Sequence, residues 1–146
     1  MPISRSLLKR DNNNQVPQLE VKIRCDFVSS HQSVYISLYK ITNRRTLNKK
    51  RIGVLRLDHI RGNTWETHFP GSIPMSERNK GYGIYMYSLA ADLASFNQWT
   101  LRSSNLRSIS ANRCWRSNRL RKYYDVKKRR GFYYIKPKKT INLMAG

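Results

Sequence analysis

Acidic residues and cysteines are scarce in this sequence. Eight Asp and Glu stand against 29 Lys and Arg, which leaves a formal net charge of +21. The two cysteines, Cys25 and Cys114, are far apart, and the sequence has no CxxC pair. Zinc sites need closely spaced ligands, so this pattern, with the scattered His59 and His68, predicts no metal site. We expect both cysteines to be partly buried free thiols in a reducing compartment.

Long hydrophobic runs are also missing. No stretch approaches the ~20 apolar residues that span a bilayer as a helix, so we expect no membrane partner. Residues 1–17 contain no apolar run of signal-peptide length, which favours an intracellular, cytoplasmic protein. These residues are polar and basic, with three consecutive Asn at positions 12–14, and we expect them to form a flexible arm.

The chain is nevertheless rich enough in apolar and aromatic residues to fold. Hydrophobic residues make up 39% and aromatic residues 11% of its 146 positions, which excludes a disordered basic tail. The length fits a single domain with a real core. We place this domain at residues 18–140 and a short tail at residues 141–146.

The first half of the domain has the alternating pattern of β-strands. Apolar side chains at every second position from Leu19 to Phe27 predict a half-buried strand. The connection to the next strand is too short for a helix, so the first two strands should form a hairpin. A basic loop at residues 42–50 then precedes two more strands. The expected strands cover residues 19–27, 34–41, 52–60 and 64–69.

The second half mixes helices with short strands. We expect a helix at residues 83–96, a strand at 99–102, a helix at 110–124 and a strand at 132–135. Apolar residues recur at helical spacing in both helices. They are Met86, Leu89, Ala90, Leu93 and Phe96 in the first helix, and Ala111, Cys114, Trp115 and Leu120 in the second. The pattern as a whole predicts an α+β fold with a mainly antiparallel sheet.

A basic, glycine-containing turn separates the fourth strand from the first helix. It consists of Arg78, Asn79, Lys80, Gly81, Tyr82 and Gly83. Glycines allow the backbone to approach a ligand closely, and the free N–H groups at a helix N-terminus favour an anion such as pyrophosphate. Such a turn is also common as a tight strand-to-helix connection without any ligand.

This turn, the four strands before it and the strand–helix–strand order after it resemble the GNAT family, the GCN5-related N-acetyltransferases. The resemblance covers roughly residues 19–136. It implies a twisted, mainly antiparallel sheet with flanking helices. Residues 103–115, a Ser-rich strand end followed by a helix with Ala111 and Trp115, also look like a pattern in small phage-associated GNAT-like proteins.

The resemblance implies acetyl-CoA as a substrate. In the family, an R/Q-x-x-G-x-G/A loop binds the pyrophosphate of acetyl-CoA, and Arg78, Gly81 and Gly83 occupy the matching positions. The backbone from Arg78 to Gly83 would therefore hold the pyrophosphate. Ser104 and Asn105 would lie beside the pantetheine arm.

Glu66 stands where family members often carry a general base that takes a proton from the acceptor amine. Because Glu66 lies opposite the face formed by Trp65, Thr67 and Phe69, it could equally be an exposed strand residue. Two features depart from the family. Trp115 occupies the place of a frequent Tyr acid, and the helices usual between the first two strands are missing.

The C-terminal part of the chain concentrates the positive charge. Residues 93–146 contain 14 Lys and Arg and a single acidic residue, Asp125, a formal net charge of +13. The candidate polyanion-binding residues are Arg113, Arg116, Arg119, Arg121, Lys122, Lys127, Lys128, Arg129 and Arg130. Such a cluster favours DNA, RNA or another polyanion, and interleaved Tyr and Phe offer faces for base stacking. A merely solubilising surface, with Phe132 and Tyr134 in the core, is the alternative.

Two functions are therefore expected. The first is an acetyl-CoA-dependent N-acyltransferase acting on or near nucleic acid. The second is a catalytically inactive GNAT-like protein that binds nucleic acid or protein partners in an assembly such as a virion or a ribonucleoprotein, either phage-encoded or virion-associated. The glycine turn favours the first, and Trp115 and the surplus charge favour the second.

Overall fold

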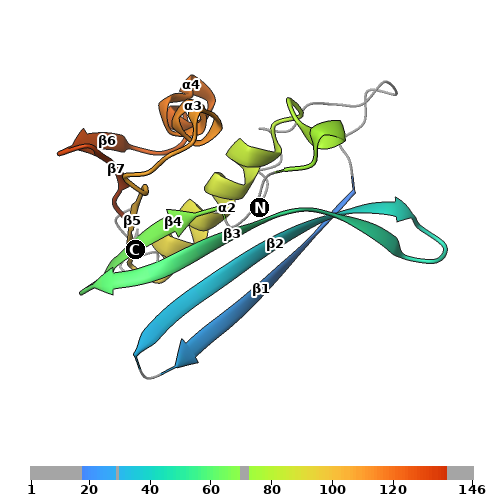
Figure 1. Cartoon of the computed structure of the whole chain (residues 1–146), viewed down its shortest axis with the longest axis horizontal. Coiled ribbons are helices and arrows are strands. Elements are labelled where there is room, and N and C mark those ends of the chain that lie inside the picture. Colours follow the sequence, from blue (N-terminus) through green and yellow to red (C-terminus); the bar gives the residue numbers. More distant parts are fainter. Residues whose placement is uncertain (1–17, 29, 70–72, 138–146) are drawn as a thin grey trace, which may run out of the picture.

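A single β-sheet organises the protein. The computed structural model describes residues 18–28, 30–69 and 73–137. Within them, seven strands form one sheet in the order β1–β2–β3–β4–β5–β7–β6 (Figure 1). The strands are β1 (Leu19–Val28), β2 (His31–Asn43), β3 (Asn48–Arg61), β4 (Thr64–His68), β5 (Thr100–Arg102), β6 (Val126–Arg129) and β7 (Phe132–Ile135). The helices are η1 (Met75–Glu77), α2 (Tyr82–Phe96), α3 (Ile109–Arg116) and α4 (Asn118–Arg121).

Strands β1 to β4 form the expected antiparallel meander. The β1–β2 hairpin is confirmed, with Leu19 opposite Lys40 and Val28 opposite His31. The basic loop between β2 and β3 is much shorter than expected, because both strands extend into it and only residues 44–47 remain. The Asn43 side chain accepts hydrogen bonds from the backbone N–H groups of Arg45 and Thr46, at 2.9 and 3.2 Å, which closes this turn.

Strands β4 and β5 form the only parallel pair among the described strands. The connection between parallel neighbours must cross over the sheet, and α2 supplies it. This helix packs against β2, β3 and β5, and buried side chains from both layers form the core. They include Val34, Ile36, Leu55, Leu57 and Leu101 from the sheet and Met86, Leu89 and Ala90 from α2.

The single helix expected at residues 110–124 is wrong. The chain has extended backbone angles at Ser117, with φ −64° and ψ 131°, and this residue separates α3 from α4. The Ser117 hydroxyl accepts a hydrogen bond from the Arg119 N–H at 3.1 Å, so it caps the new helix. The inward residues Trp115 and Leu120 are nevertheless buried as expected.

Several apolar side chains are more exposed than the sequence pattern predicts. Strand β1 is one edge, and its apolar face is only partly covered, so Phe27 is 57% exposed and Cys25 is exposed. At the end of α2, Phe96 is 87% exposed.

Strand β6 was not expected from the sequence. In its partner β7, the buried residues are Tyr133 and Ile135, so the interpretation of Phe132 and Tyr134 as core residues is wrong.

The α+β class with a mostly antiparallel sheet is thus confirmed. Within the described part of the chain, every helix is too short or too polar to cross a membrane. The arm expected at residues 1–17 and the tail expected at residues 141–146 lie outside the described residues.

Candidate functional site

The glycine turn leads directly into α2. Gly81 precedes the helix with a left-handed backbone (φ 86°), a conformation that favours glycine. The helix begins with a hydrogen bond from the Tyr85 N–H to the Gly81 carbonyl at 3.0 Å. The first N–H groups of any helix lack intrahelical acceptors, and Gly81 offers no side chain to cap them. The start of α2 therefore presents backbone donors.

Positive charge surrounds a buried carboxylate beside this turn. Lys40, Lys50 and Lys80 lie 3.7, 3.5 and 3.2 Å from the carboxylate of Glu77. Burial alone would raise the pKa of Glu77, but the hydrogen bond from Lys80 and the charges of Lys40 and Lys50 hold it below its usual range. Three ammonium groups thus face one carboxylate, and the cluster keeps a net positive charge.

Two residues of the turn have structural roles that the sequence did not indicate. A Cβ atom at Gly83 would lie 3.2 Å from the Cys114 Sγ atom, so glycine here permits the close packing of α2 on α3. The Tyr82 side chain is buried in the core, and its hydroxyl has no hydrogen-bond partner among the described residues. Burial, with the charge of Glu77, raises the pKa of Tyr82 to about 12. Tyr82 as a whole is buried, so of these two residues only Gly83 is partly exposed.

A cavity of about 160 Å³ lies where β5 parts from β4. Arg102 is the last residue of β5 to pair with β4, opposite Glu66. The next residue, Ser103, donates its N–H to the Tyr133 carbonyl of β7 at 2.8 Å, so the chain turns away from β4. The residues that line the resulting opening are Thr67, His68, Phe69, Tyr87, Ser104, Leu106, Arg107, Ser108 and Ala111.

The cavity includes one of the two residues expected beside the pantetheine arm. Ser104 lines it, whereas Asn105 is exposed and does not. Arg107 fixes this loop, because its guanidinium donates hydrogen bonds to the Ser103 hydroxyl, the Ser104 carbonyl and the Gly131 carbonyl at 3.1, 2.7 and 2.8 Å. The wall of the cavity is therefore tied to the turn between β6 and β7.

A phenol from α2 faces the same cavity. Tyr87 is buried, and its ring packs edge-on against Trp115 and Phe69, with centroids 5.1 and 5.4 Å apart. Burial raises the pKa of Tyr87 well above its usual range, so the phenol keeps its proton at neutral pH. Trp115 itself is fully buried, which confirms its role as a core residue.

Glu66 belongs to a charged network on the opposite face of β4. It is 9% exposed, so the alternative of an exposed strand residue is wrong. The Arg102 guanidinium donates to one carboxylate oxygen of Glu66 through Nε, at 2.8 Å, and through Nη2. Directly across the sheet, Asp58 is paired with Arg56, whose Nε lies 3.0 Å from its carboxylate.

The sequence pattern did not indicate His68 as a site residue. Its Nε2 atom lies 3.0 Å from the Glu66 carboxylate and 3.5 Å from that of Asp58, and His68 is also among the residues that line the cavity. The available signal was its position two residues after Glu66, which puts both side chains on one face of a strand. Tyr87 was missed as well, although it lies one helical turn beyond Gly83.

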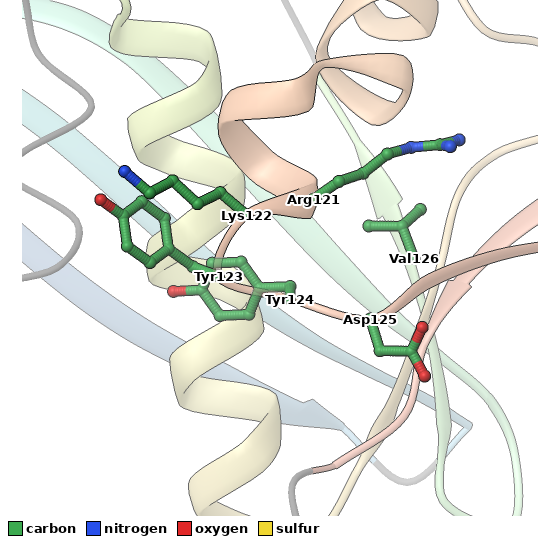
Figure 2. Close-up of a pocket in the computed structure, with 6 residues that line it drawn as sticks. All are labelled: Arg121, Lys122, Tyr123, Tyr124, Asp125 and Val126. Atoms are coloured by element: carbon green, nitrogen blue, oxygen red, sulfur yellow. The ribbon is translucent and has the colours of Figure 1, made fainter.

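The basic candidate residues gather on α3, α4 and the β6–β7 hairpin. Eight of the nine are exposed, and Arg119 is half-buried. Figure 2 shows the shallow hollow, of about 360 Å³, that Arg121 to Val126 line, with Arg121 and Lys122 extending to opposite sides. The Tyr124 hydroxyl donates to Asp92 of α2 at 2.7 Å, which anchors this segment to the core.

No group of three or more His, Cys, Asp and Glu that could hold a metal ion occurs among the residues with described positions. The side chains that face the cavity and the start of α2 offer hydrogen-bond donors, one imidazole and one phenol instead. A scan against protein-family models, a search of curated proteins and a search of solved structures each found no match.

Proposed function

We propose that this chain is a GNAT-type N-acyltransferase that uses acetyl-CoA as acyl donor. The observation that carries the proposal is the cavity between the parallel strands β4 and β5, one turn of α2 away from the glycine turn. A crossover helix whose first N–H groups lack a side-chain cap, next to a cavity between two strands, provides one place for an anion and one for an acyl group.

The start of α2 suits the pyrophosphate of acetyl-CoA. The free N–H groups and the helix dipole favour negative charge there. The net positive cluster of Lys40, Lys50, Lys80 and Glu77 adds attraction, and Arg78 is exposed beside it. Arg78 is also held in place, because its Nε donates to the Ile73 carbonyl at 3.0 Å.

The cavity suits the thioester and the leaving group. An amine that attacks the thioester carbonyl displaces a thiolate, which must be protonated or hydrogen-bonded. Tyr87 brings a protonated phenol to the cavity from α2. It takes the place of the Tyr that the family often carries where this chain has Trp115.

Calorimetric titration with acetyl-CoA tests the proposal, after bound nucleic acid has been removed at high salt. We expect saturable binding, which Gly81→Glu should abolish because it places a carboxylate and a strained backbone at the anion site. Gly62→Glu is the matched control, since Gly62 also has a left-handed backbone (φ 54°) but lies in the β3–β4 turn. Absence of binding at millimolar acetyl-CoA would refute the proposed function.

We propose DNA or RNA as the ligand of the basic surface on α3, α4 and the β6–β7 hairpin. The specific observation is uncompensated charge. Among the described residues, Lys127 is the only one of the nine basic candidates with an acidic partner, Asp125, at 3.5 Å, and both side chains are exposed. Basic groups without acidic partners are free to pair with phosphates.

Salt dependence of nucleic-acid binding tests this second proposal. For duplex DNA, the logarithm of the affinity should fall linearly with the logarithm of salt concentration, by about 0.9 per phosphate contact. The double variant Arg129→Gln/Arg130→Gln should lower this slope by about 1–2, whereas Arg44→Gln/Arg45→Gln, with the same charge loss at the β2–β3 turn, should not. A flat salt response would contradict the proposal.

The two titrations together separate the two expected functions. Binding of acetyl-CoA favours the N-acyltransferase. Binding of nucleic acid without acetyl-CoA favours the alternative, an inactive GNAT-like component of a virion or a ribonucleoprotein.

A further inference from the structure

We propose that His68 is the residue that accepts the proton of the acceptor amine, and that Glu66 is a positioning residue that orients it. The inference rests on the proposed N-acyltransferase function and identifies the base of that same site. The proton acceptor is then not Glu66, which the sequence indicated, but His68, two positions further along β4.

The carboxylate of Glu66 is poorly placed to be the base. The Arg102 guanidinium donates to it through two nitrogens, and Glu66 is not among the residues that line the cavity. Protonating this carboxylate would give up charge-assisted hydrogen bonds in a buried place. The Arg102 guanidinium is held in turn by the Phe132 ring, whose centroid lies 4.3 Å from it.

His68 has the access that Glu66 lacks. His68 is among the residues that line the cavity, together with Tyr87 and Ser104. Its Nε2 atom lies 3.0 Å from the carboxylate of Glu66 and 3.5 Å from that of Asp58. A carboxylate neighbour fixes the hydrogen on the nitrogen that it contacts, which leaves the lone pair on the other nitrogen. Within the described part of the chain, Nδ1 has no hydrogen-bond partner and is free to accept a proton.

The charges around His68 are balanced. Asp58 and Arg56 on β3 form one ion pair, and Glu66 on β4 with Arg102 on β5 forms another. His31 on β2 lies 3.7 Å from Asp58 and is exposed. Arg107, from the loop after β5, is the remaining charged residue that lines the cavity. Both acids therefore have arginine partners.

The acetyl group moves from the thioester sulfur to the amine nitrogen. The amine nitrogen of the acceptor, R–NH₂, attacks the thioester carbonyl, a C–N bond forms and the C–S bond breaks. His68 Nδ1 takes the proton that the amine loses, and the departing thiolate takes the phenol proton of Tyr87 to become CoA-SH, after which solvent reprotonates Tyr87. The products are the N-acetylated amine and the free thiol. His68 then returns its proton to solvent.

The test measures turnover and acetyl-CoA binding of variants, and the tautomer of the His68 imidazole. Turnover is followed as thiol release from acetyl-CoA with spermidine, a lysine peptide and a peptide with a free N-terminus as acceptors. We expect His68→Gln to lower kcat by about 100-fold or more and to remove the fall in rate at acidic pH, while the Kd for acetyl-CoA stays within about twofold. His59→Gln, another half-buried strand histidine, should leave kcat within about twofold.

Glu66→Gln separates positioning from catalysis. We expect a smaller loss in kcat, about tenfold, with the fall at acidic pH retained. Nitrogen-15 NMR of the wild-type protein should show His68 as a single tautomer protonated at Nε2, and Glu66→Gln should mix the two tautomers. The wild-type spectrum needs no variant to fold, and a tautomer protonated at Nδ1 would overturn the assignment.

The outcomes distinguish the two proposals. If acetyl-CoA does not bind to the wild-type protein, the proposed function fails and the assignment of His68 fails with it. If the wild-type protein binds acetyl-CoA but turns over none of the amines, a catalytic base is refuted while the donor site stands. If His68→Gln keeps both its turnover and the fall in rate at acidic pH, only the assignment of His68 is overturned.

Discussion

Removal of the buried carboxylate of Glu77 should destabilise the protein in a pH-dependent way. Glu77→Gln leaves Lys40, Lys50 and Lys80 close together without a counter-charge. Breaking a fully buried ion pair costs about 3–5 kcal/mol. Here the Glu77 side chain is only 6% exposed, but the lysine side chains are 31–43% exposed, so solvent takes over part of the lost interaction. We therefore expect a loss of about 1–3 kcal/mol in the free energy of unfolding at neutral pH.

The sign of the pH dependence follows from the lowered pKa of Glu77. A carboxyl group with a depressed pKa in the folded state stabilises the fold above its unfolded-state pKa, and this stabilisation is lost as the pH falls through the folded-state pKa. Urea unfolding from about pH 7 down to about pH 3 should show the wild-type protein and Glu77→Gln converging at acidic pH.

A surface carboxylate provides the control for this prediction. Glu20 pairs with Lys49 at 2.8 Å on an exposed part of the sheet, and Glu20→Gln should change the stability little. Equal stabilities of Glu77→Gln and the wild-type protein at neutral pH would refute the reasoning, as would a difference that persists at acidic pH.

Three further predictions concern side chains around the core. Gly83→Ala should be more destabilising in the wild-type protein than in a Cys114→Ala background, because the added Cβ atom would lie 3.2 Å from the Cys114 Sγ atom. A double-mutant cycle of unfolding free energies should show a coupling of about 0.5–2 kcal/mol. Burial raises the pKa of Cys114 to about 11, so iodoacetamide should label the exposed Cys25 first, as read by mass spectrometry, and equal rates would contradict this. Tyr82→Phe, which removes a buried hydroxyl without a partner, should cost almost nothing in thermal unfolding, whereas Tyr124→Phe should cost about 1 kcal/mol through its lost bond to Asp92.

Local sequence patterns predicted most of the elements but not how far they extend. The alternation from Leu19 to Phe27 predicted β1, and the turn at Gly81 predicted the start of α2, because both signals arise within a few residues. The break at Ser117 was missed, since a single serine that caps a new helix leaves the helical spacing of Trp115 and Leu120 intact. The exposure of Phe27 was missed because a pattern of alternation cannot tell an edge strand from a covered one.

The candidate site was harder to predict than the fold, since it combines distant segments. The Glu66 carboxylate is buried because Arg102 pairs with it, and 36 positions separate these residues in the sequence. The cavity joins residues from β4, α2, α3 and the loop after β5. Only the parallel register of β4 with β5 brings these segments together, and that register depends on the whole crossover.

Arg107 links the cavity to the β6–β7 hairpin through hydrogen bonds. One guanidinium nitrogen holds both the Ser104 carbonyl in the cavity loop and the Gly131 carbonyl in the turn beside Arg130. A ligand that displaces this turn must therefore strain the loop, and a ligand in the cavity that displaces the loop must strain the turn. Because linkage is reciprocal, a ligand that changes the affinity of the other surface by some factor has its own affinity changed by the same factor.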